Sequence, residues 1–188
     1  MAGRPRRHRP GAREPGQHQR PGEKRGEATG PNPTDRGKRG SKYHLIVDRQ
    51  GIPLAATLTA ANVHDSKQLE PLVDAIPPIR RPIGQPGRPR FRPNKLHGDK
   101  AYDYPPHRRA LRRRGIVPRI ARRGIESGER LGRHRWVVER TIGWLLAYRR
   151  LAVRYDRQAA TVLGLLHLAC ALVCVRFLRR AESVPTGP

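Results

Sequence analysis

Hydrophobic residues are rare before Ser41 and then occur in short, separated groups. Two apolar runs, residues 43–47 and 52–63, flank the polar residues 48–51, a pattern that predicts an antiparallel hairpin. Asp65 and Gln68 have the spacing of a capping box, and the apolar positions that follow recur at helical intervals. We therefore expect an amphipathic helix over residues 65–76, ended by two prolines.

The middle of the chain alternates between short elements and basic loops. Residues 77–93 contain six prolines and predict a loop, and residues 95–99 predict a short strand that ends in Asp99. A basic helix over residues 106–114 is followed by a second strand over residues 116–121, which Pro118 restricts to a sheet edge or a strand end. Residues 122–133 predict a mobile basic loop.

Two helices are expected near the C-terminus, over residues 134–150 and 156–178, the second with Asp156 as its N-cap. The apolar stretch 159–175 is slightly short and slightly polar for a membrane span of about 20 residues. We favour a buried helix, with a small membrane protein as the alternative. Strands first, then alternating helix and strand, then two helices predict an α/β domain.

The first 40 residues contain no Leu, Ile, Val, Phe, Trp or Tyr but 14 glycines and prolines. Such a segment cannot bury enough apolar surface to offset its chain entropy. We expect a disordered basic arm over residues 1–40, a folded domain over residues 41–180 and a disordered tail over residues 181–188. The arm either contacts nucleic acid electrostatically or has no selected structure.

The charge of the chain restricts the classes of function that it can have. Among 188 residues, 40 are Lys or Arg and 15 are Asp or Glu, which gives a net charge of +25. A field of that strength favours a polyanionic partner, above all nucleic acid. Two cysteines and no signal-type apolar stretch disfavour a secreted protein. We therefore expect a cytoplasmic protein that binds a polyanion.

Two acidic positions are candidates for chemistry. Asp99 follows a short strand, and a carboxylate there can present a divalent cation to phosphate oxygens. The competing interpretation is that Asp99 and Asp103 are caps. Glu139 lies on a predicted helix four residues after Arg135, so the two form a surface ion pair, or Glu139 is a metal ligand beside an arginine that contacts DNA phosphate.

A third group, His167, Cys170 and Cys174, is spaced along one face of the last helix and has donors suited to zinc or copper. Three ligands on one helix without a fourth make a poor structural site. We favour buried thiols and a hydrogen-bonded histidine, because free cysteine behaves as a small hydrophobic residue in protein cores.

Three segments, in this order, resemble the C-terminal part of bacterial insertion-sequence transposases of the Asp-Asp-Glu type: GPNPTDRG (30–37), HGDKAYD (97–103) and RHRWVVERT (133–141). The segments TAANVHD (59–65) and RIARRG (119–124) fit the same family. The resemblance extends from about residue 30 to residue 180, and the motifs are specific as a set.

The resemblance implies a ribonuclease H-like fold, a mixed sheet flanked by helices that presents three carboxylates to two Mg²⁺ or Mn²⁺ ions. Asp99 matches the second carboxylate and Glu139 the third, so both are the expected catalytic residues and metal ligands. Paired cations would stabilise an in-line phosphodiester displacement, in which water and then a DNA 3′-hydroxyl is the nucleophile. The expected DNA contacts are Arg133, Arg135, Arg149 and Lys100.

The chain departs from the family at the first catalytic Asp. No Asp occurs before Asp35, which lies in a turn motif, and no β-prone strand precedes it. The arrangement resembles elements with two overlapping frames, in which the upstream frame supplies the first Asp and the DNA-end-binding domain. We expect an incomplete ribonuclease H-like sheet and a fragment that is inactive alone.

Expected partners follow from this reading. They are DNA (the insertion-sequence ends and the target) and either the upstream-frame product or a second copy of the chain, with no membrane. The expected location is the bacterial cytoplasm, in association with the nucleoid. The alternative function is a non-catalytic basic DNA-binding remnant that competes with the intact transposase.

Overall fold

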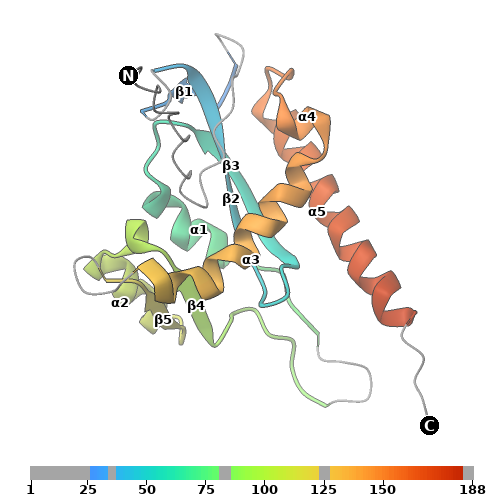
Figure 1. Ribbon diagram of the computed structural model, residues 1–188. Coiled ribbons are helices and arrows are strands. Elements are labelled where there is room, and N and C mark those ends of the chain that lie inside the picture. The colour runs from blue at the N-terminus through green and yellow to red at the C-terminus, as the bar shows by residue number, and fades with distance from the viewer. Residues whose placement is uncertain (1–25, 34–36, 81–85, 123–127, 184–188) are drawn as a thin grey trace, which may run out of the picture.

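The computed structural model describes residues 26–33, 37–80, 86–122 and 128–183, and residues 128–135 by their backbone only. The described chain is a mixed α/β fold (Figure 1). Its elements are β1 (Gly30–Pro31), β2 (Arg39–Val47), β3 (Pro53–Ala60), the 3₁₀ helix η1 (Asp65–Gln68), α1 (Leu69–Asp74), β4 (Lys95–Gly98), the 3₁₀ helix η2 (Lys100–Tyr102), α2 (Pro105–Arg113), β5 (Val117–Ile120), α3 (Gly128–Leu146), α4 (Arg149–Ala152) and α5 (Ala159–Glu182).

The predicted hairpin is confirmed as β2 and β3, which pair antiparallel from Ser41 opposite Ala60 to Val47 opposite Pro53. The turn between them is held by the Asp48 carboxylate, which accepts hydrogen bonds of 2.8 Å from the backbone N–H groups of Gln50 and Ile52. A short β1 extends this sheet, so the strand order is β1-β2-β3.

A second sheet of the described residues contains β4 and β5, which pair in parallel with Leu96 opposite Pro118. Both strands were predicted, and β5 pairs with β4 alone among the described strands, as Pro118 requires. Ile46 of β2 and Leu96 of β4 belong to one buried cluster, together with side chains of α1, α2 and β5. The two sheets therefore share a hydrophobic core.

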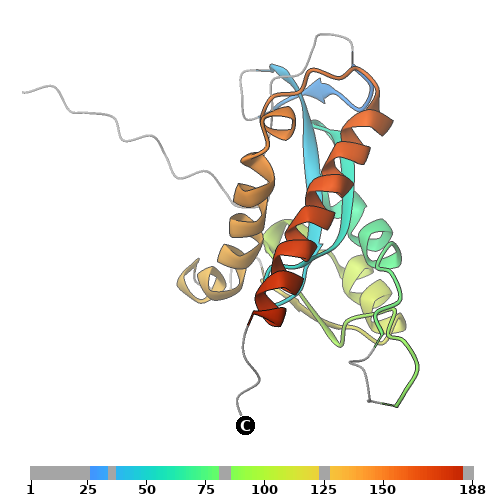
Figure 2. The same ribbon diagram turned by 90° about the vertical axis from the view of Figure 1, so that its right-hand side faces the viewer.

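The opposite face of the β2–β3 hairpin is covered by α3 and α5, as Figures 1 and 2 show together. Tyr43 and Ala56 pack there against Leu145 and a buried stripe of α5 that includes Leu166. By length and composition alone, α5 could cross a membrane. One stripe of α5, at Val162, Leu166, Ala169 and Val173, is buried in the fold, whereas Leu168, Leu172, Val175 and Leu178 on its other side are exposed, so the expected buried helix is confirmed for one face only.

Packing begins earlier in the chain than composition indicated. Residues 1–25 lie outside the described residues, but residues 26–33 and 37–40, assigned above to the arm, join the fold. The Glu27 carbonyl accepts a hydrogen bond from the buried Arg154, and Ser41 Oγ donates one to the Ala28 carbonyl. A contact with a residue more than 100 positions away thus helps to hold a segment that has no large apolar side chain of its own. The last five residues, 184–188, are also outside the described residues.

Two of the predicted caps are wrong because tertiary contacts use the side chains. The N-cap of η1 is His64 rather than Asp65, which is buried beside Lys42, and the expected 12-residue helix is split into η1 and α1. Asp156 pairs with Arg150 at 3.1 Å, and α5 begins after Gln158 instead.

The basic loop expected over residues 122–133 is shorter than predicted. Helix α3 begins at Gly128, six residues before the expected start, so the second half of this segment is helical. The loop was expected because glycine costs about 1 kcal/mol in a helix interior and this segment contains Gly124, Gly128 and Gly132. Residues 123–127 lie outside the described residues.

Candidate active site

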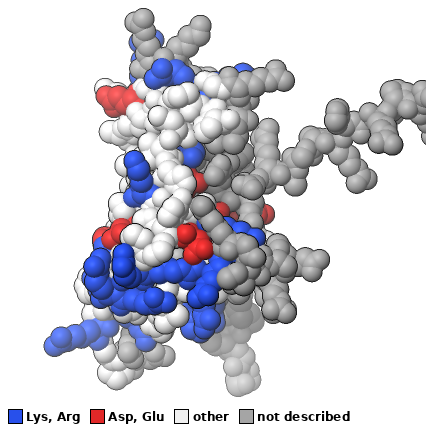
Figure 3. Space-filling view, turned by 90° about the vertical axis from the view of Figure 1, so that its left-hand side faces the viewer, with Lys and Arg blue, Asp and Glu red and all other residues white. Residues whose placement is uncertain are grey.

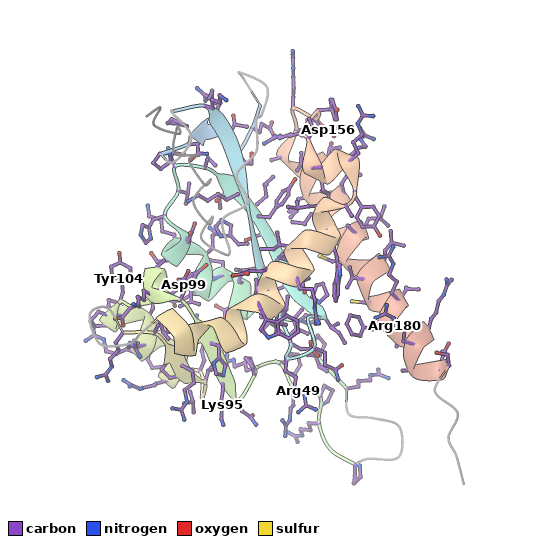
Figure 4. All side chains as sticks on the ribbon, in the orientation of Figure 1. Arg49, Lys95, Asp99, Tyr104, Asp156 and Arg180 are labelled. Atoms are coloured by element: carbon purple, nitrogen blue, oxygen red, sulfur yellow. The ribbon has the colours of Figure 1, made fainter. Side chains whose placement is uncertain are left out.

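Asp99 stands at the end of β4, where the sequence placed it (Figure 4). Its side chain is half-buried, and its Oδ1 accepts a hydrogen bond of 2.9 Å from the backbone N–H of Ala101. This contact makes Asp99 the N-cap of η2. The capping interpretation is therefore correct for the local geometry, and it fixes the rotamer of a carboxylate at the end of a strand.

Asp103 has a different role from the cap considered above. It receives two hydrogen bonds from Arg108, at 2.9 Å from Nε and 2.7 Å from Nη2, and the N-cap of α2 is Tyr104. Arg108 also donates to the carbonyl of Ile120 in β5. Arg108 thus ties α2 to β5, and its charge-assisted pair with Asp103 holds the guanidinium in place.

Tyr102 is the neighbour of Asp99 that sequence reasoning missed. Burial raises the pKa of its phenol, and the carboxylates of Asp65 and Asp99 raise that pKa further. The 3₁₀ helices η1 and η2 that carry these residues are in contact. Two carboxylates from distant parts of the chain therefore act on one phenol. In the sequence, Asp65 stands out only as a capping-box residue and as the last residue of the TAANVHD segment.

The charge of Asp65 is balanced by a buried ion pair. Lys42 Nζ on β2 lies 3.0 Å from Asp65 Oδ1 and donates to the Val63 carbonyl at 3.1 Å. The adjacent His44 is also buried, and its Nε2 is 2.7 Å from Thr59 Oγ1. Burial is the largest influence on the pKa of His44 and lowers it to about 4, with the Lys42 charge lowering it further and Asp65 opposing both. His44 is therefore neutral at pH 7.

Glu139 is exposed on α3, and the next two residues fix the rotation of that helix. Thr141 Oγ1 donates to the Gly51 carbonyl at 2.8 Å, and Arg140 Nη2 donates to the Gln50 carbonyl at 2.5 Å. The Arg140 guanidinium also lies over the ring of Trp144, 4.7 Å from its centroid. These contacts hold one side of α3 on the hairpin turn and leave Glu139 towards solvent.

Helix α3 can lie this close to the β2–β3 turn only because residue 51 is glycine. Gly51 has a φ of +92°, and a Cβ there would lie 2.8 Å from Thr141 Oγ1. A side chain would therefore be strained and would displace α3.

The expected DNA contacts are only partly described. Lys100 is half-buried in η2, and Arg149 is exposed at the start of α4. The side chains of Arg133 and Arg135 lie outside the described residues, as does Asp35. Exposed arginines also cover α2, and Figure 3 shows Lys and Arg gathered in a band across the lower part of the face where this helix lies.

The described residues contain no cluster of three or more His, Cys, Asp or Glu side chains arranged for a metal ion. Cys170 belongs to the core beside α3, where burial raises its pKa to about 11, and His167 Nε2 lies 3.1 Å from the Ala56 carbonyl. Asp99 and Glu139 lie on separate elements, and a shared ion between them stays a prediction.

Comparison with known proteins identifies the family. The model of the transposase DDE domain matches residues 9–174. A protein of Burkholderia cepacia, described as a candidate transposase for insertion sequence element IS402, is 54% identical over 155 residues, which cover 82% of this chain and 72% of the relative. No solved structure matches the chain. The chain therefore belongs to the DDE-domain transposase family of insertion sequences.

Proposed function

We propose that this chain supplies two of the three catalytic carboxylates of an enzyme that cleaves the ends of an insertion sequence and joins them to target DNA. The observation that carries the proposal is Asp99, which is held by a cap contact at the end of a strand, in a chain of the DDE family. Glu139 on α3 is the second carboxylate. It is exposed on a helix whose rotation is set by the contacts of Thr141 and Arg140.

The donor set fits a hard divalent cation. Carboxylate oxygens are the ligands that Mg²⁺ and Mn²⁺ prefer, and both proposed ligands are carboxylates. Two such ions, when bound, stabilise the attacking and leaving oxygens of a phosphodiester displacement. Lys100 and Arg149, with Arg133 and Arg135, would hold the DNA backbone beside them.

The third carboxylate would come from one more strand. The β2 edge away from β3 pairs with β1 only at Arg39 and Gly40, and β4 pairs only with β5 among the described strands. These two open edges border the same core, since Ile46 and Leu96 pack in one cluster. Open backbone edges favour the addition of a strand. A strand placed between them would complete a ribonuclease H-like sheet, and the product of an upstream frame is the proposed source.

The proposal predicts that this 188-residue chain does not nick DNA by itself. We would assay nicking and strand transfer on DNA that carries the element's ends, in Mg²⁺ or Mn²⁺, with and without the upstream-frame product. Activity is expected only with both polypeptides, and Asp99→Asn or Glu139→Gln should abolish it. The matched control is Glu182→Gln, an exposed glutamate at the end of α5. Activity of the chain alone, or activity that survives Asp99→Asn, would contradict the proposal.

The second candidate function is non-catalytic DNA binding, as a competitor of the intact transposase. The net charge of +25 favours it. Both functions predict binding whose logarithm falls linearly with the logarithm of the salt concentration. They differ in metal binding, because only the catalytic proposal predicts Mn²⁺ binding that depends on Asp99 and Glu139. Either function would place the protein in the cytoplasm, associated with the nucleoid.

A further inference from the structure

The β4–β5 sheet leaves one of its faces open. Leu96 and Ile120 are buried in the core, whereas Lys95, Val117 and Arg119 are exposed, with Val117 at 47%. Parallel sheets in proteins are almost always covered on both faces. An exposed face on a parallel pair is therefore a candidate contact surface, and its two long cationic side chains indicate the chemistry of what covers it.

The segment that leads into β4 adds a hollow beside this face. The hollow is lined by Arg90, Phe91, Arg92 and Asn94. Its backbone is held in place, because the N–H and C=O groups of Arg90 exchange two hydrogen bonds with Ile79, at 2.9 and 2.8 Å. Phe91 is 58% exposed, although contact of a large apolar side chain with water is unfavourable.

The cationic side chains of this surface, Arg90, Arg92, Lys95 and Arg119, form no ion pair among the described residues. Arg92 nevertheless donates to the Arg114 carbonyl at 3.4 Å, and the pKa of Asp74 is lowered first by its hydrogen bond with Arg114 and further by the Arg92 charge. The acids of the neighbouring helix α1 are engaged elsewhere, since Arg114 lies 2.7 Å from Asp74 and 3.0 Å from Glu70. Figure 4 shows Lys95 at the lower edge of the molecule, away from Asp99 at the other end of the strand.

We propose that the surface formed by Arg90, Phe91, Arg92, Lys95 and Arg119 binds single-stranded DNA. Cationic side chains that follow the backbone, together with an aromatic ring on which an unpaired base stacks, are the features of such sites. The exposed arginines of α2 have no exposed aromatic ring among them, so that surface lacks the feature that indicates single-stranded DNA. The inference rests on the proposed function for its choice of DNA as the polyanion.

The test measures binding of the whole chain to a 20-nucleotide single strand and to a 20-base-pair duplex over a range of salt concentrations. Lys95→Gln combined with Arg119→Gln should weaken single-strand binding about 25-fold at 0.1 M salt. Each lost phosphate contact should also make the slope of the logarithm of the binding constant against the logarithm of the salt concentration shallower by about 0.7. The matched control is Arg176→Gln with Arg179→Gln, two exposed arginines on α5, which should change binding less than threefold.

Phe91→Leu separates stacking from charge. It should weaken single-strand binding by at least fivefold, because one base stacked on an aromatic ring raises the binding constant by at least about that factor. It should leave duplex binding unchanged, because the bases of a duplex are already paired and stacked. Equal thermal midpoints of the variants and the wild type exclude misfolding as the cause. The inference is overturned if the β4–β5 variant and the α5 control both bind single-stranded DNA as tightly as the wild type does. It is also overturned if Phe91→Leu weakens binding to the single strand and to the duplex equally.

Further arms separate this inference from the proposed function. If the surface variants bind DNA like the wild type while Asp99→Asn still abolishes cleavage by the two-polypeptide enzyme, the inference fails and the proposed function stands. If the wild type binds no DNA, the inference fails, and only the cleavage assay with both polypeptides decides the proposed function. Loss of binding to anionic phospholipid vesicles or to polyglutamate in the same variants, without loss of DNA binding, would overturn the assignment to DNA.

Discussion

Thr141 on α3 donates a hydrogen bond from Oγ1 to the carbonyl of Gly51, 90 residues earlier in the chain, over 2.8 Å. The Thr141 side chain is fully buried, and Gly51 is the residue at which the β2–β3 turn bends. One contact thus joins the helix that carries Glu139 to the hairpin that forms the centre of the larger sheet.

Replacing this threonine should destabilise the fold. Thr141→Val keeps the volume but leaves a buried carbonyl without its donor, which costs about 1–3 kcal/mol of unfolding free energy. Denaturant unfolding would measure the loss. The control is Thr161→Val on the exposed side of α5, which we expect to stay within about 0.5 kcal/mol of the wild type. Equal stability of both variants would show that the contact does not hold α3.

Arg154 should be the most sensitive charged residue in the described chain. It is 4% exposed and donates to the carbonyls of Glu27, Asp156 and Arg157 and to Ser41 Oγ. Arg154→Met removes all of these donors, and we expect a loss of about 3 kcal/mol or more. Limited proteolysis should then cut near residues 26–33, which Arg154 holds in place. Arg179→Met is the control, and resistance to the protease in both variants would refute this role.

Acid should weaken the fold through His44. Its pKa in the folded protein is about 4, below the ordinary value of 6.5, so the unfolded chain binds the proton more tightly. The stabilisation from neutral His44 is complete above pH 6.5 and is lost as the pH falls from 6.5 through 4, by up to about 3 kcal/mol. Thermal midpoints from pH 8 to pH 4 would test this, with His44→Gln expected to flatten the profile. A His44→Gln profile as steep as that of the wild type would contradict the assignment.

Helix α5 should behave as a core helix. Leu166 is fully buried and Leu168, two residues on, is 59% exposed, so the same truncation tests opposite sides of one helix. Leu166→Ala should cost about 2–5 kcal/mol, and Leu168→Ala should stay within about 0.5 kcal/mol of the wild type. Unfolding of the purified soluble chain would measure both. Similar losses at the two positions would indicate that the exposed side is also covered in solution.

The local sequence pattern was sufficient to predict the elements that are determined by residues close together in the chain. The hairpin, the strand before Asp99, the helix over residues 105–113 and the restricted strand at Pro118 were all predicted within a few residues, because turn residues, proline and hydrophobic spacing act between close neighbours in the chain. The same reasoning placed Asp99 at a strand end and set Glu139 on a helix. The family follows from motifs, and the comparisons confirm it.

The tertiary structure decided what depends on residues far apart in the sequence. Asp65 is not the N-cap of η1 but pairs with Lys42, 23 positions earlier. The pKa of Tyr102 is raised by burial and by the carboxylates of Asp65 and Asp99, which no local pattern connects. Residues 26–33 join the fold through Arg154, which donates to the Glu27 carbonyl, and through the pairing of β1 with β2, although their own composition predicts disorder. Buried ion pairs and hydrogen bonds form only where the fold excludes water, so their partners are set by the path of the chain in space.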